Sequence, residues 1–168
     1  TRRSTNDKRK NNTKKYIEDV LAVKEKYQDQ INIFLGVEQD VLGQRFKKHD
    51  PYDYIIGSVH FVKAGDKYLA VDFSSDVTKE IVEYYGSFLN YAKSYFEEVK
   101  KIANMDEVDI VGHVDLLTKF NENEEFIKFD DPDYLKLAYN CIDQLLAKNK
   151  IFEVNTGAIA RGQRKTPY

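Results

Sequence analysis

Three apolar stretches of this sequence each lead to a side chain that could bind a metal ion. The three side chains are Glu38 after residues 31–37, His60 after residues 54–56 and a Gly-Ser turn, and His113 after residues 108–111 and a glycine. Two imidazoles and a carboxylate are a common ligand set for zinc, manganese or iron. If these stretches are parallel strands of one sheet, their carboxyl ends share an edge, where functional groups collect. A metal held there with one open position would supply hydroxide near neutral pH.

A histidine at the end of a strand also has a plainer interpretation. Taken alone, it is more often a hydrogen-bonded residue of the core or rim than a metal ligand. Three strand ends in succession favour metal binding for Glu38, His60 and His113. His49 follows no apolar stretch and lies in a polar connector, so we interpret it as a surface residue.

Other polar residues are expected near the same edge. Asp115 follows His113 by two positions and either supports that ligand or is simply a polar group at a strand end. Glu153 interrupts the last apolar stretch, so its charge is either buried and paired or directed toward the site. Asn155 follows that stretch on the same rim.

Two arginines near the end of the chain could bind a phosphate group. Arg161 and Arg164, with Lys165 beside them, follow the last predicted strand. A guanidinium group can bind phosphate oxygens in a bidentate manner, which favours a phosphate site. Solvated charge is the alternative interpretation of the same cluster.

The elements that would position these residues alternate between strands and helices. Helical spacing of apolar residues predicts a helix around residues 16–27, capped by Asn12 or Thr13, and one long helix over residues 77–102. Asp131-Pro132 predicts the start of a further helix, and Gly65-Asp66 the turn of a hairpin. The predicted strands cover residues 31–37, 54–56, 108–111 and 151–154. This alternation predicts an α/β fold with a parallel sheet.

Leu135, Ala138, Ile142 and Leu145 are expected to line the inner face of the helix that begins at Asp131-Pro132. The stretch 31–37 is almost continuously apolar, which is typical of a strand buried on both faces.

The composition limits the classes of protein that this chain could represent. Its 168 residues are enough for one domain, and a net charge of −2 argues against binding nucleic acid. Residues 1–15 carry seven basic side chains and one acidic, which we interpret as a solvated lead-in, with a phosphate-binding arm as the alternative. No apolar run reaches the roughly 18 residues that span a membrane. The single cysteine excludes an intramolecular disulfide and suits the cytoplasm.

Four motifs resemble the PHP (polymerase and histidinol phosphatase) superfamily, and most of all its histidinol-phosphate phosphatases. They are "FLGVEQD", "YDYIIGSVHFV", "DIVGHVDLLTKF" and "FEVNTGAIARG". The resemblance implies a distorted seven-stranded β/α barrel with up to three divalent metal ions (zinc, manganese or iron) on one rim. It also implies hydrolysis of L-histidinol phosphate, a small phosphorylated substrate, to histidinol and phosphate in histidine biosynthesis.

The resemblance also implies roles for single residues. Glu38 resembles a carboxylate that bridges two metals, and His60 and His113 resemble histidines that hold one of them. Arg161 resembles an arginine that binds the substrate phosphate. The family pattern Asn-Thr-Ser-Gly reads Asn-Thr-Gly-Ala at residues 155–158, a mild departure.

Two further ligand motifs of the family do not occur in these 168 residues: an opening His-x-His strand and a closing Asp-x-His strand. We therefore expect a single PHP-like domain over residues 1–168 that represents the central part of the barrel. We expect this chain to be inactive alone, because it lacks several metal ligands. Open barrel edges could pair between chains and form a homo-oligomer.

Two other functions remain open on the sequence. The chain could be a PHP phosphoesterase that acts on a phosphotyrosine protein or a nucleic acid. It could also be a homologue that binds no metal and serves a structural or binding role.

Overall fold

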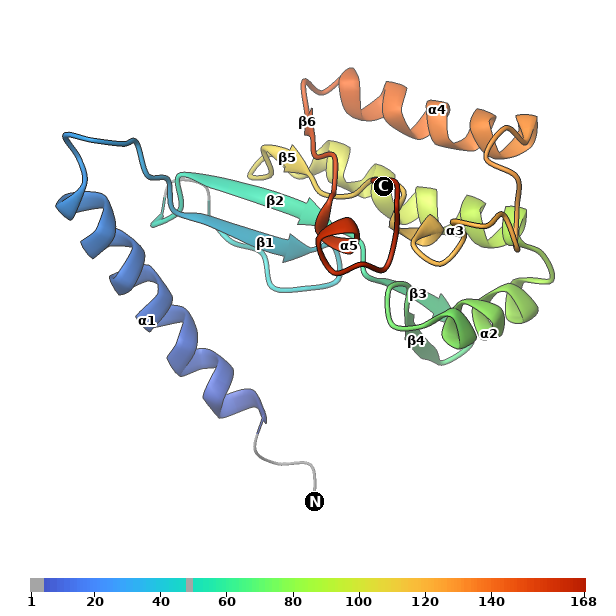
Figure 1. Cartoon of the computed structure of the whole chain (residues 1–168), viewed down its shortest axis with the longest axis horizontal. Helices are drawn as coiled ribbons and strands as arrows, with labels where there is room; N and C mark the ends of the chain where they lie inside the picture. Colours follow the sequence, from blue (N-terminus) through green and yellow to red (C-terminus); the bar gives the residue numbers. More distant parts are fainter. Residues whose placement is uncertain (1–4, 48–49) are drawn as a thin grey trace.

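A parallel sheet of four strands forms the centre of the structure, a computed structural model that describes residues 5–47 and 50–168 (Figure 1). The order of its strands is β1 (Gly36–Asp40), β2 (Tyr54–Ser58), β5 (Ile110–Val111) and β6 (Ile151–Phe152). All three pairings are parallel, so the carboxyl ends of the strands share one edge. This confirms the predicted α/β fold. The prediction for His49 lies outside the described residues.

Helices and a hairpin connect these strands. A long helix, α1 (Thr5–Lys26), precedes the sheet, and η2 (Leu116–Thr118) and α4 (Pro132–Leu146) connect β5 to β6. The last helix, α5 (Gly157–Ala160), follows β6. The segments between β2 and β5 are β3 (Phe61–Ala64), β4 (Lys67–Ala70), α2 (Ser75–Tyr85), α3 (Phe88–Lys100) and η1 (Lys101–Asn104).

Two local predictions are confirmed by these elements. Strands β3 and β4 pair antiparallel on either side of Gly65-Asp66, as the turn signal predicted. The carboxylate of Asp131 accepts hydrogen bonds from the backbone N–H groups of Asp133 and Tyr134, both at 3.0 Å. Asp131 is therefore the N-cap of α4, with Pro132 in its first turn.

The single long helix predicted over residues 77–102 is wrong, because two helices occupy this region. Gly86 ends α2 with φ 77°, a left-handed conformation that glycine adopts at little cost. Ser87 then begins α3, with its side chain accepting a hydrogen bond from the Asn90 N–H at 3.1 Å. The continuous apolar spacing masked this Gly-Ser break, because both helices bury a face in the same core.

The other helix boundary was also predicted wrongly. Helix α1 begins at Thr5, so Asn12 and Thr13 lie inside it and are not its cap.

The first strand lies further along the chain than predicted. Ile31 and Phe34 are 60% and 63% exposed, and pairing begins only at Gly36. Before that point the Leu35 N–H donates to the Asp53 carboxylate at 2.7 Å instead of to a neighbouring strand. Glu38 therefore lies inside β1 and not beyond its end, and the predicted burial on both faces is wrong.

The strands predicted at residues 108–111 and 151–154 are shorter than expected. Ile151 in β6, the last strand of the sheet, is 62% exposed, and Val154 just after it is 72% exposed. Pairing of such an edge between two copies of the chain stays a prediction.

The core lies between the sheet and helices α3 and α4, which contact each other (Figure 1). Its largest members come from α3, where Tyr91, Tyr95 and Phe96 are at most 1% exposed. Each such side chain stabilises the fold by about 1.5–3 kcal/mol. Leu145 is buried in this core, and Leu135 and Ala138 pack against it, as predicted. Leu135 and Ala138 also line an open apolar groove, together with Ile142.

Helix α1 attaches to the beginning of the sheet through polar contacts. The Tyr16 hydroxyl donates to the Gly36 carbonyl oxygen at 2.9 Å, and the Lys24 ammonium lies 2.7 Å from the Asp53 carboxylate. Its apolar side chains Leu21 and Val23 are each 44% exposed. None of the helices in the described residues is long and apolar enough to cross a membrane.

A polar network around the buried Gln39 supports β1 on the face opposite Glu38. Gln39 is 1% exposed, and its side chain donates to Glu107 at 2.9 Å and accepts from the Phe46 N–H at 2.6 Å. The Arg45 guanidinium makes two hydrogen bonds to the same Glu107 carboxylate. Arg45 and Gln39 together lower the pKa of Glu107 to about 2.

We predict that Glu107→Gln destabilises the chain in a pH-dependent way. Because the folded state lowers the pKa of Glu107, the ionised carboxylate stabilises the fold fully above the ordinary pKa of about 4.5, and this contribution is lost as the pH falls toward about 2. The free energy of unfolding should fall by about 1–2 kcal/mol at neutral pH, and the difference from the unmodified chain should shrink in acid. Urea unfolding with a chelator present measures both values.

Glu97→Gln is the control for this prediction. Its carboxylate is 60% exposed and pairs with Lys100 at 2.7 Å, so its loss should change the stability by less than about 0.5 kcal/mol. Equal and pH-independent effects of the two substitutions would contradict the prediction.

Candidate metal centre

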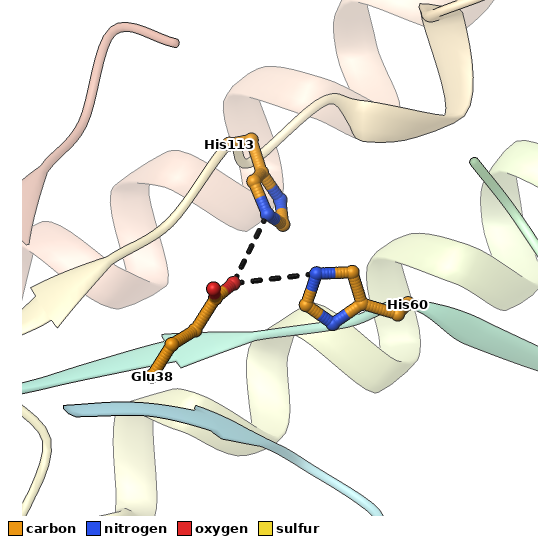
Figure 2. A group of neighbouring side chains, drawn as sticks. All are labelled: Glu38, His60 and His113. Carbon is orange, nitrogen blue, oxygen red and sulfur yellow. Dashed lines mark ion pairs between the residues drawn. The ribbon is translucent and has the colours of Figure 1, made fainter. Parts of the chain in front are cut away.

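Glu38, His60 and His113 meet at the carboxyl edge of the sheet. The Nε2 atoms of His60 and His113 each lie 3.3 Å from the same oxygen, Oε1 of Glu38. Figure 2 shows both rings directed at this carboxylate. One ligand atom from each residue lies within 4.8 Å of the others, and the two rings are 5.0 Å apart between centroids. The structure thus brings together the three residues that the sequence singled out.

The parallel register places these side chains. On β1, alternation directs Glu38 and Asp40 to one face and Gln39 to the other, where it is buried. Strand β2 ends at Ser58, and His60 follows two residues later. His113 follows β5 by two residues, with a φ of 25°, a left-handed backbone that is uncommon for residues other than glycine.

Gly112 allows the segment that carries His113 to lie against β2. A Cβ atom at residue 112 would come within 2.5 Å of Ser58 Oγ and 3.0 Å of the Ile56 side chain. Contacts that short cannot form without a shift of the backbone or of Ser58, whose side chain is completely buried. A residue with a side chain would not fit at position 112, which explains why a glycine precedes His113.

The charges of the site favour a cation between the three residues. Hydrogen bonds from His113 and His60 hold the pKa of Glu38 well below its usual range. Asp40 and then Glu38 raise the pKa of His60 to about 9. A metal ion bound here would replace the proton on Nε2 of His60 and would itself pair with the Glu38 carboxylate.

Two of the three separations between the possible ligand atoms fit a metal ion, and the third is within 4.8 Å. Two atoms bound to one tetrahedral zinc by bonds of about 2.0–2.2 Å lie roughly 3.3–3.6 Å apart. The two 3.3 Å separations from Glu38 Oε1 agree with this spacing. Among the described residues this is the one cluster of at least three possible metal ligands.

Glu153 and Asn155 support the segment that carries His113. Glu153 Oε2 accepts a hydrogen bond from the backbone N–H of His113 at 3.0 Å. The Asn155 amide donates to both oxygens of Glu153 at 3.5 Å, and its own oxygen accepts from the Gly157 N–H at 2.9 Å. Glu153 therefore follows β6 instead of lying inside it, and its carboxylate is hydrogen-bonded to the segment that carries His113. From the other side, the Tyr95 hydroxyl donates to the His113 carbonyl oxygen at 3.5 Å.

Asp115 lies outside the three-residue cluster. Its side chain lines the apolar groove beside Phe96 and Tyr134, and burial raises its pKa. Its backbone oxygen accepts hydrogen bonds from the Thr118 hydroxyl and N–H. A supporting role for Asp115 toward the metal ligands stays a prediction.

The two arginines differ in their surroundings. Arg164 is 6% exposed and donates to the backbone oxygens of Thr118 and Thr166, at 2.6 and 3.1 Å, and to the Thr166 hydroxyl. It thereby ties the end of the chain to η2. Arg161 is exposed at the end of α5, where its Nε donates to Gln163 at 3.3 Å. Phosphate binding stays a prediction for both, and Arg161 is the more accessible.

One neighbour of the cluster was missed by reasoning from the sequence. Asp40 Oδ2 lies 3.1 Å from Nδ1 of His60 and accepts a hydrogen bond from the His60 backbone N–H at 2.9 Å. Glu38 and Asp40 are two positions apart, which places them on one face of any strand. That spacing would have identified Asp40 had the strand been placed at residues 36–40.

The sequence matches the PHP domain family over residues 7–157. The chain belongs to the PHP domain family. Among its relatives, a protein of Schizosaccharomyces pombe named a probable histidinol-phosphatase is 26% identical over 167 residues, which cover 91% of this chain and 51% of that protein. The histidinol-phosphatase of Bacillus subtilis is 27% identical over 118 residues, 63% of this chain and 44% of that protein. This PHP chain thus spans about half the length of these relatives.

The fold agrees with a solved structure. The crystal structure of hisK from Listeria monocytogenes, which is assigned as a histidinol phosphatase, superposes with a TM-score of 0.76 at 21% identity. The alignment covers 94% of the PHP chain and 63% of hisK. This similarity shows the α/β fold with its parallel strands, and closure into a barrel stays a prediction.

We predict that Gly112→Ala weakens metal binding. The added methyl group would meet Ser58 and Ile56, so it should displace the segment that carries His113. We expect the dissociation constant for zinc, measured by calorimetry, to rise by about tenfold or more. Gly86→Ala is the matched control, because it strains the left-handed end of α2 but meets no atom within 4 Å. The control should lose about 1 kcal/mol of stability and keep its zinc affinity; equal zinc affinities of the two variants would contradict the prediction.

Proposed function

We propose that this PHP domain is a metal-dependent phosphomonoester hydrolase and that its substrate is L-histidinol phosphate, in histidine biosynthesis. The cluster of Glu38, His60 and His113 at the carboxyl edge of the sheet carries this proposal. Support for the substrate comes from the relatives, which are named histidinol-phosphatases and belong to organisms as distant as a yeast and a bacterium.

The three clustered residues would hold a divalent metal ion: zinc, manganese or iron. Such an ion supplies a Lewis acid that polarises a phosphoryl oxygen and lowers the pKa of water. The chain's own contribution is the geometry. Glu153 holds the backbone of His113, and β1 holds Glu38 between the two imidazoles.

Recognition of the phosphate group would fall to Arg161. Arg161 follows the carboxyl end of β6, and the cluster lies at this same edge of the sheet. The Arg161 side chain is exposed. A guanidinium group suits the dianion of a phosphomonoester, since it offers two parallel N–H donors. The net charge of −2 gives no general attraction for a nucleic acid, which favours a small substrate.

We predict that the chain binds one zinc ion through this cluster. Elemental analysis after dialysis should find about one zinc per chain, because the described residues hold one cluster of three ligands. Glu38→Gln and His113→Ala should each weaken binding by at least about 100-fold, since each removes one ligand. His113→Ala leaves the Glu153 contact to the backbone N–H in place, so it tests the imidazole alone. Retention of zinc by both variants would refute the site.

The proposed substrate is tested by measuring phosphate release from the zinc-loaded chain. We expect histidinol phosphate to be hydrolysed in preference to a phosphotyrosine peptide and a dinucleotide, at rates below about 1 s⁻¹. The rate should be low because one three-ligand cluster holds fewer metals than the three that the family resemblance implied. Turnover at or above the usual enzyme range would show that further metals are dispensable. A preference for the peptide or the dinucleotide would overturn the substrate assignment.

Arg161→Ala should raise the KM for histidinol phosphate by about tenfold or more, since it removes a charged partner of the phosphate. Lys148→Ala is the control, because this lysine is exposed in the turn between α4 and β6 and therefore precedes the strand that Arg161 follows. An unchanged KM in the arginine variant would remove Arg161 from the site.

A further inference from the structure

Asp40 makes contacts to both the ring and the backbone of His60. Its Oδ2 lies 3.1 Å from the ring atom Nδ1 and accepts a hydrogen bond from the backbone N–H at 2.9 Å. The other oxygen, Oδ1, accepts from the Leu42 N–H at 2.8 Å. Both carboxylate oxygens are thus engaged, so the Asp40 side chain is itself held in one orientation.

The backbone of Asp40 is equally fixed. It is the last residue of β1 and pairs with Ser58 of β2, two residues before His60. Asp40 also lies on the same face of β1 as Glu38. One strand therefore carries both the carboxylate that faces Nε2 of His60 and the carboxylate that faces Nδ1.

The two histidines of the cluster differ in this respect. Nδ1 of His60 faces a carboxylate, whereas Nδ1 of His113 is buried without a hydrogen-bond partner among the described atoms. His113 is instead held through its backbone, by Glu153 and Tyr95. The backbone of His60 is held as well, since its N–H donates to Asp40 and its carbonyl oxygen accepts from the Val71 N–H at 2.9 Å. What distinguishes His60 is the carboxylate of Asp40 at Nδ1 of its ring.

We propose that Asp40 is a positioning residue for the metal centre. It accepts a hydrogen bond from Nδ1–H of His60 and so favours the tautomer whose Nε2 lone pair would be free to bind a cation held with Glu38. A histidine ligand commonly donates its second N–H to a carboxylate, which sets the ring orientation and increases the basicity of the ligating nitrogen. The inference rests on the metal centre proposed above, and adds to it a residue that binds neither metal nor substrate.

The experiment compares zinc binding by the unmodified chain with that of Asp40→Ala and Asp40→Asn. Zinc affinity is measured by calorimetry with a competing chelator. The tautomer of His60 is read from long-range proton–nitrogen NMR spectra of the zinc-loaded chain. Asp131→Ala is the matched control. Like Asp40, Asp131 accepts hydrogen bonds from two backbone N–H groups, but it caps α4 and makes no contact with a histidine of the described residues.

We expect Asp40→Ala to bind zinc about 10–100-fold more weakly than the unmodified chain. Asp40→Asn keeps an oxygen that can accept the Nδ1 proton, so it should lose less affinity and keep the tautomer. Asp131→Ala should lose stability but no zinc affinity. The NMR spectra should show the proton of His60 on Nδ1 in the unmodified chain and a changed ring signal in Asp40→Ala.

Three results would overturn the inference. The first is equal zinc affinity in Asp40→Ala and the unmodified chain. The second is an equal loss of affinity in Asp40→Ala and Asp131→Ala, which would mark a general effect of lower stability. The third is a His60 that binds zinc through Nδ1. Failure of the unmodified chain to bind zinc would instead refute the proposed metal centre, and with it the role of Asp40. If Asp40→Ala does not fold, the Asp40→Asn titration and the tautomer of the unmodified chain still decide the question.

Discussion

Parallel pairing of β2 with β1 on one side and β5 on the other is the constraint on which the site depends. Residues that follow parallel strands are delivered to a common edge, however far apart they lie in the chain. Glu38 and His113 are separated by 75 positions, yet Oε1 of Glu38 lies 3.3 Å from Nε2 of His113. A shift of the β1 register by one residue would turn Glu38 to the opposite face and bring Gln39 toward the histidines.

Close approach at the end of β2 strengthens this arrangement. Gly57 and Gly112 face side chains of neighbouring segments at distances that leave no room for a Cβ atom. The space is occupied by Val108 beside Gly57 and by Ser58 beside Gly112. Small residues at the strand ends thus allow the ligand-bearing segments to lie close together, so that the ligand atoms meet without long, flexible side chains.

Polar support is distributed on both faces of the sheet. On the face of the site, Asp40 contacts His60 and Glu153 contacts the backbone of His113. On the reverse face, the buried Gln39 donates to Glu107 and holds β1 against the segment before β5. These contacts leave Glu38, His60 and His113 little freedom to rearrange, and a preformed site would lose less entropy on binding a metal ion.

Local chemistry made several features predictable from the sequence alone. The candidate ligands Glu38, His60 and His113, the α/β class, the hairpin at Gly65-Asp66 and the cap at Asp131 all depend on residue type and short-range spacing. Other features depended on packing between distant segments. Ile31 and Phe34 have strand-like character but remain outside the sheet, because Asp53 binds the backbone before β1. Arg164 has the sequence context of a phosphate ligand, yet backbone oxygens of Thr118 and Thr166 take up its donors. Asp40 acquires its contact with His60 only through the pairing of β1 with β2, since 20 positions separate the two residues. Residue types thus identified the three clustered residues that are candidate metal ligands. The tertiary structure decided which polar side chains contact them, because those contacts arise between segments that only the folded sheet brings together.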